Sequence, residues 1–139
     1  MLSMVYVSSA SRPLIEEDFV QLLSAAQANN QRNGITGLLL YKDGNFMQAV
    51  EGPDEQVLGL FDRIRRDSRH HGVLMLLKEQ ITERRFPDWS MSMKNVHQLS
   101  EAQRSKVNPF LTDSFTADSY RSNPSAAIKL LLTFRDVVR

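Results

Sequence analysis

Gln48 is a polar residue inside the otherwise apolar stretch "FMQAV" of residues 46–50. In an extended strand, its side chain would share one face with Phe46 and Val50. A buried amide without a hydrogen-bond partner costs about 1–3 kcal/mol. The position of Gln48 therefore requires a polar partner, either in a neighbouring strand or in a bound ligand.

Tyr6 is the candidate partner in the protein itself. It lies among the β-forming residues 2–9 and is the large polar-tipped side chain of that stretch. Two interpretations remain open from the residues. The phenol and the amide of Gln48 satisfy each other as a buried polar pair, or both point toward a ligand held between two helices.

Asparagines gather in "NNQRNGITG", where the first predicted helix should end. Gly34 is typical of a helix terminus, and Asn33 fits that role next to it. The terminus leaves Asn29 and Asn30 unexplained. An asparagine amide offers a donor and an acceptor together, which is what the pyrimidine edge of a uracil or a flavin requires.

Basic residues are concentrated in "RIRRDSRHH", residues 63–71. We expect Arg65 and Arg66 to be solvated cations near a helix C-terminus. Adjacent histidines diverge and no third ligand is nearby, so we expect no metal site. The remaining candidates for contacts with a phosphate or a ribityl chain are Arg63, Asp67, Arg69 and His70.

Trp89 and Met91 alternate in "WSMSM" and share one face of a predicted strand. The simpler interpretation is that both are core residues. The alternative is that the indole and the sulfur lie beside a redox-active ring.

The composition excludes several classes of protein. The chain has 139 residues, no cysteine and a formal charge of +1, so disulfides, thiolate metal sites and cysteine nucleophiles are excluded, and no polyanionic partner is indicated. No serine-hydrolase elbow, Rossmann glycine motif or phosphate-loop lysine motif occurs. The N-terminus is too short and polar for a signal peptide, and we expect a soluble cytoplasmic protein without a membrane partner.

The periodicity of the chain predicts an α+β, ferredoxin-like βαββαβ fold with one additional strand. We expect both helices on one face of the sheet, and the first and third strands side by side and parallel in its middle. The predicted elements are strands at 2–9, 34–41, 46–52, 72–80 and 89–93, and helices from Pro13 to about Asn30 and from Pro53 to about Asp67.

The segment 94–139 differs in kind from the rest. It predicts a short helix near 99–106, a Ser/Asp/Thr-rich loop and a final helix over 124–138. That final helix is apolar over more than half of its circumference, so we expect it to pack on the open face of the sheet or on a partner.

Five separated blocks together resemble the BLUF family of flavin-based blue-light photoreceptors. They are "YVSSA", "NNQRNGITGLLLY", "FMQAVEG", "DSRHH" and "RRFPDWSM", in this order over about residues 2–94. The resemblance implies a ferredoxin-like fold with FAD held noncovalently between the two helices. It also implies that Tyr6 and Gln48 are the photoactive pair.

The resemblance assigns further roles by position. It implies that the amide of Gln48 bridges the phenol of Tyr6 to the N5/O4 edge of the flavin, and that light rearranges these hydrogen bonds. By the same resemblance, Asn29 and Asn30 contact the pyrimidine edge, Arg63 the flavin O2 side, and Asp67, Arg69 and His70 the ribityl and phosphate part, while Trp89 and Met91 carry the signal.

The implied protein is a photoreceptor and not an enzyme. We expect residues 1–95 to form the flavin-binding domain and residues 96–139 a helical extension that packs on the sheet or on a partner. This arrangement resembles the short BLUF proteins, which signal to a separate protein and commonly form homo-oligomers. The alternatives are a chromophore-free ferredoxin-like module for ligand or subunit binding, and an RNA-binding module, which the near-neutral charge disfavours.

Overall fold

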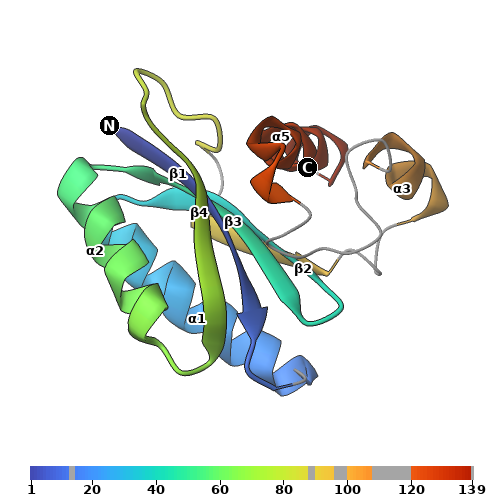
Figure 1. Ribbon diagram of the computed structural model, residues 1–139, viewed down its shortest axis with the longest axis horizontal. Coiled ribbons are helices and arrows are strands. Elements are labelled where there is room, and N and C mark those ends of the chain that lie inside the picture. Colours follow the sequence, from blue (N-terminus) through green and yellow to red (C-terminus); the bar gives the residue numbers. More distant parts are fainter. Residues whose placement is uncertain (13–14, 88–89, 96–99, 108–119, 139) are drawn as a thin grey trace.

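The described part of the chain forms a five-stranded sheet with helices on both faces (Figure 1). The computed structural model describes residues 1–12, 15–87, 90–95, 100–107 and 120–138. The strands are β1 (Leu2–Ala10), β2 (Thr36–Lys42), β3 (Asn45–Gly52), β4 (His70–Gln80) and β5 (Ser90–Asn95). The helices are α1 (Glu16–Asn33), α2 (Asp54–Arg66), α3 (Glu101–Val107) and α5 (Pro124–Val138).

The strand order β4-β1-β3-β2-β5 confirms the ferredoxin-like prediction and places β1 and β3 together in the centre. The predicted parallel pairing of these strands is wrong, because β1 and β3 are antiparallel. The crossover through α1 makes β1 parallel to β2, and the hairpin then reverses the chain. Since β3 is inserted between β1 and β2, it runs opposite to both.

The hairpin between β2 and β3 fixes the register of the central strands. Asp43 and Gly44 both have positive φ, 52° and 83°, as a type I′ turn requires. Gly37 allows the two strands to approach, since a Cβ there would lie 2.0 Å from the carbonyl oxygen of Ala49. In this register Leu39 lies opposite Gln48.

The two faces of the sheet have separate hydrophobic cores. Helices α1 and α2 lie on one face and α5 lies on the other (Figure 1). Side chains alternate along each strand, so Tyr6 belongs to the face that α2 covers and Val7 to the face that α5 covers. The buried hydrophobic residues that cluster on the α2 face, among those described, are Leu2, Met4, Tyr6, Ile35, Leu39, Tyr41, Phe46, Val50 and Val57.

Helix α5 packs on the open face of the sheet, which is one of the two positions that its apolar surface predicts. Ala127, Leu130 and Leu131 of α5 are fully buried in one core with Val5 and Leu38. The division of the chain at residue 95 stays a prediction, and α5 shares its core with the strands. Within the described residues, no helix is long and apolar enough to cross a lipid bilayer.

Arg85 and Phe86, in the segment that follows β4, make contacts with both β3 and α5. The backbone N–H of Phe86 donates to Oε1 of Glu51 at 2.5 Å. Arg135 of α5 donates to the carbonyl oxygen of Arg85 at 2.6 Å, and its guanidinium carbon lies 5.9 Å from the centre of the Phe86 ring. Helix α5 is therefore attached to the sheet by polar contacts as well as by its apolar face.

Candidate functional site

Tyr6 and Gln48 form a buried polar pair in the two central strands. They are direct cross-strand partners on β1 and β3. The hydroxyl of Tyr6 donates a hydrogen bond to Oε1 of Gln48. Both side chains are buried, with exposed fractions of 1% and 7%. Gln48 thus has the polar partner that its apolar sequence context requires.

The environment of Tyr6 keeps its phenol protonated. Burial raises the pKa of Tyr6 well above its ordinary value of 10.0, because the phenolate would lose its hydration. The ring packs against Phe61 of α2, with a centroid separation of 5.4 Å and an interplanar angle of 60°. The phenol is therefore a neutral hydrogen-bond donor over the whole physiological pH range.

The strands on either side of this pair carry apolar residues at the same level. Met75 of β4 lies opposite Tyr6, and Leu39 of β2 lies opposite Gln48. The residues of β4 and β2 that are paired with Tyr6 and Gln48 are thus apolar, and the two polar side chains face each other between them. An amide in such surroundings gains strongly from each additional donor or acceptor that a ligand brings.

Asn30 adds a second polar side chain to the buried interior. It lies in the last turns of α1, where its backbone carbonyl oxygen accepts the N–H of Ile35 at 2.8 Å, just beyond the C-cap residue Gly34 with φ 70°. The side chain is 1% exposed, and its Oδ1 has no hydrogen-bond partner within the described structure. Asn29, by contrast, is exposed.

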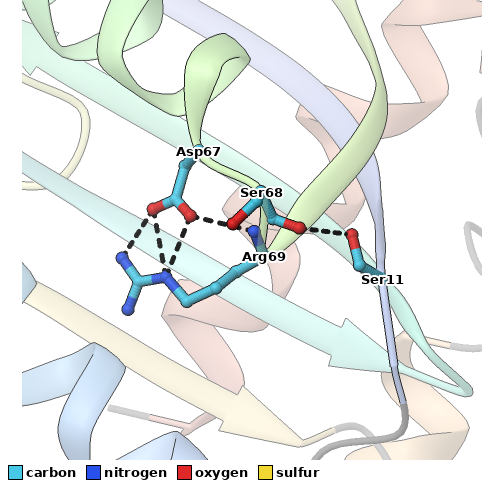
Figure 2. Close-up of polar contacts among 4 residues, drawn as sticks. All are labelled: Ser11, Asp67, Ser68 and Arg69. Carbon is cyan, nitrogen blue, oxygen red and sulfur yellow. Dashed lines mark hydrogen bonds and ion pairs between the residues drawn. The ribbon is translucent and has the colours of Figure 1, made fainter.

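Asp67 and Arg69 form a compact ion pair in the turn from α2 to β4 (Figure 2). Nη2 of Arg69 lies 2.6 Å from Oδ2 of Asp67, and the backbone N–H of Arg69 donates to Oδ1 at 2.9 Å. The side-chain hydrogen bond to Asp67 and the charge of that carboxylate raise the pKa of the Arg69 guanidinium. Ser11, just after β1, donates through its hydroxyl to the carbonyl oxygen of Ser68 at 2.6 Å, which fixes the turn against the sheet.

The other arginines of this region face solvent. Arg65 and Arg66 are exposed and both pair with Asp62, at 3.1 and 3.2 Å, which confirms the prediction of solvated cations. Arg63 is exposed as well. The described residues contain no group of three or more histidines, cysteines or acidic residues arranged to bind a metal.

Of the two predicted signalling residues, Met91 lies on β5, and its backbone alone is described. Trp89 lies outside the described residues, and the side chains of Met91 and His70 lie outside them too. Strand β5 pairs with β2 in parallel, and the register is irregular where Met91 falls. Met93 is the residue opposite Leu39, and so it continues the row of Tyr6 and Gln48.

The structure thus brings some of the predicted site residues into contact in two separate pairs. Tyr6 and Gln48 are in contact, whereas Asp67 and Arg69 pair with each other in the turn that follows the C-terminus of α2. The sequence reasoning missed Phe61 as a neighbour of Tyr6. Its i, i+3, i+4, i+7 spacing with other apolar residues of α2 identified it only as a core residue.

A family comparison decides what kind of protein has this arrangement. The family model described as BLUF, "Sensors of blue-light using FAD", matches residues 1–92. The chain belongs to the BLUF family. This family comprises blue-light sensors that use FAD, so the fold and the BLUF resemblance expected from the sequence are confirmed.

Curated relatives carry a BLUF-like region within much longer chains. Photoactivated adenylate cyclase subunit beta of Euglena longa is 33% identical over 101 residues, which is 72% of this chain and 12% of the relative. The same subunit of Euglena gracilis matches with equal identity and coverage. This chain therefore spans about an eighth of the length of those relatives.

Solved BLUF structures match over nearly the whole chain. The dark-state structure of BlrB, a BLUF protein, is 32% identical with a TM-score of 0.77, covering 97% of this chain and 95% of that one. The photo-activated state of BlsA is 27% identical with a TM-score of 0.77, covering 94% of each chain. A bacterial light-regulated adenylyl cyclase is 38% identical with a TM-score of 0.73, covering 78% of this chain and 32% of that one.

Proposed function

We propose that this BLUF protein senses blue light through the hydrogen bond between Tyr6 and Gln48, next to FAD held between α1 and α2. The observation that carries the proposal is the buried contact between this phenol and this amide. A neutral phenol and a primary amide can exchange the roles of donor and acceptor without creating a buried charge. This property suits a switch inside an apolar core.

Asn30 supports the fit of a flavin to this face. Its buried Oδ1 has no partner within the described structure, and such an acceptor costs free energy unless a ligand supplies a donor. The pyrimidine edge of a flavin carries an imide N–H, which is a donor of the required kind. We assign Asn30 as the residue that holds this edge, with Asn29 beside it at the exposed end of the site.

Bound between α1 and α2, FAD would supply the chromophore for blue light and an acceptor for one electron and one proton. Tyr6 holds the proton nearest to Gln48 and is the donor in this exchange. Its raised pKa keeps the proton on the phenol in the dark. The residues paired with Tyr6 on β4 and with Gln48 on β2, Met75 and Leu39, are apolar and carry no basic group that could take this proton.

Gln48 provides the two states of the switch. In the described arrangement Oε1 of Gln48 accepts from Tyr6. If the amide rotates or changes tautomer, the group facing the phenol becomes a donor, and Tyr6 then has to accept. Two hydrogen-bond patterns of one amide differ little in energy, and that small difference makes a reversible sensor possible.

The cluster at the end of α2 is assigned to the tail of FAD. Arg69 keeps its guanidinium in an exposed ion pair with Asp67, where a phosphate or a ribityl hydroxyl can reach both groups. We place His70 beside them and Arg63 at the O2 side of the ring, following the family resemblance. Trp89 and Met91 are proposed to pass the rearrangement through β5.

The output is proposed to be a contact with a separate signalling protein. The two Euglena relatives are named as subunits of photoactivated adenylate cyclases, and the match to this chain covers 12% of their length. We therefore propose a cytoplasmic, homo-oligomeric sensor that performs no catalysis itself and acts on a partner.

One absorption experiment tests the proposal. The purified protein, supplied with FAD, should be yellow, and blue light should shift its flavin band by a few nanometres to longer wavelength, reversibly in the dark. Tyr6→Phe should bind FAD and lose the shift. A normal shift in Tyr6→Phe would contradict the mechanism, and protein that stays colourless after reconstitution would favour a chromophore-free module.

A further inference from the structure

The ring of Phe61 contacts both the buried phenol and an exposed cation. Its centroid lies 5.4 Å from that of Tyr6, and the two planes are tilted by 60°. The guanidinium carbon of Arg65 lies 5.6 Å from the same centroid. Phe61 thus lies between the buried ring of Tyr6 and the exposed guanidinium of Arg65.

Phe61 faces the sheet because the apolar residues of α2 recur with the period of a helix. Val57, Leu60, Phe61 and Ile64 recur at i, i+3, i+4 and i+7 and pack against the core that contains Tyr6. Val57 is fully buried, which anchors the helix, while Phe61 is half-buried. The position of Phe61 is therefore set by the helix as a whole and not by its contact with Tyr6.

The geometry of the pair has a consequence for the hydrogen bond. Aromatic rings attract each other most in offset or tilted arrangements with centroids 4.5–7 Å apart, which includes the separation of Tyr6 and Phe61. The hydroxyl lies at the far end of the Tyr6 ring, so a small rotation of the side chain moves it by a large part of a hydrogen-bond length. Hydrogen bonds weaken steeply when their angle falls below about 120°.

We propose that Phe61 is a positioning residue of the light switch, which holds the Tyr6 ring so that its hydroxyl stays within reach of Gln48 in both hydrogen-bond arrangements. This inference rests on the proposed function of the pair. Phe61 itself exchanges neither a proton nor an electron and acts only through Tyr6.

Phe61→Leu tests the inference, because it removes the ring and keeps an apolar side chain. Two rates are measured: the recovery of the light-shifted flavin band in the dark, and the solvent exchange of the Tyr6 hydroxyl proton by NMR in the dark-adapted protein with FAD. Each should change by about two- to tenfold, which is the range that an aromatic pair contributes to an equilibrium. Phe61→Tyr retains the ring and should restore both rates.

Phe46→Leu is the matched control. Phe46 is buried on the same face and forms a similar tilted pair with Tyr41, at 5.1 Å and 53°. Phe46→Leu removes the same atoms as Phe61→Leu, and it should leave the exchange rate of the Tyr6 hydroxyl proton unchanged. An equal change in both variants would mean a general loosening of the core and would overturn the inference.

The inference is also overturned if Phe61→Leu has wild-type values for both rates. Should Phe61→Leu fail to fold, Phe61→Met replaces it with the same expected result. A wild-type protein without any light-induced shift would refute the proposed function alone. The hydroxyl exchange is measured in the dark and would still decide whether Phe61 positions Tyr6.

Discussion

The hydroxyl of Tyr6 donates to Oε1 of Gln48 across the two central antiparallel strands. Each residue satisfies the polar group of the other in a row whose neighbouring residues are apolar. We expect the contact to contribute to the folding free energy in addition to the role in light sensing that we propose for it, and the two contributions can be measured separately.

Removing one partner of this pair should cost more than removing both. Tyr6→Phe or Gln48→Leu leaves a buried polar group without its partner, so each should lower the free energy of unfolding by about 1–3 kcal/mol. The double variant should lose clearly less than the sum of the two, because the two residues share one hydrogen bond, which either single substitution already removes. Urea unfolding in the dark at saturating FAD measures this, and additive losses would show that the pair is not coupled.

The raised pKa of Tyr6 predicts an alkaline loss of stability. Burial keeps the phenol protonated in the folded protein, whereas the unfolded chain releases this proton near pH 10.0. The contribution of Tyr6 is fully present below that pH, and above it stability should fall by up to about 1.4 kcal/mol per pH unit. Thermal unfolding between about pH 8 and 11 should show a shallower decline in Tyr6→Phe, and identical pH profiles would contradict the prediction.

Asn30 and Asn29 offer a matched pair for testing the flavin contact. Asn30→Ala removes a buried acceptor, and FAD affinity should fall by about 1–3 kcal/mol, or roughly five- to 150-fold. Asn29 is exposed, so Asn29→Ala should change the affinity much less. Titration of the flavin-free protein with FAD measures both affinities. A larger loss of affinity in Asn29→Ala would contradict the assignment of Asn30 and would mean that the pyrimidine edge lies nearer to the surface.

Helix α5 should stabilise the sheet without taking part in the photochemistry. Leu130 is fully buried on the face opposite to Tyr6, and Leu130→Ala should cost about 2–5 kcal/mol of unfolding free energy. Lys129 is exposed, so Lys129→Ala should be close to neutral. The light-induced shift should keep its size in both variants, and a reduced shift in Leu130→Ala would show that α5 affects the switch itself.

The sequence alone specified the local chemistry of this protein. The alternation of β1, the helical period of α2 and the apolar neighbours of Gln48 follow from spacing rules that act over a few residues. The buried amide required a polar partner, and Tyr6 was the candidate within the predicted sheet. The family resemblance covered the same residues, and the match of the family model over residues 1–92 confirms it.

The direction of β3 relative to β1 and the identity of the contacts were decided only by the tertiary structure. The antiparallel pairing results from a hairpin inserted into a crossover, a relation between segments far apart in the chain. The packing of Phe61 on Tyr6 and the unpartnered Oδ1 of Asn30 depend on how helices lie on the sheet. Spacing within one element cannot specify such contacts, because they depend on the mutual orientation of several elements.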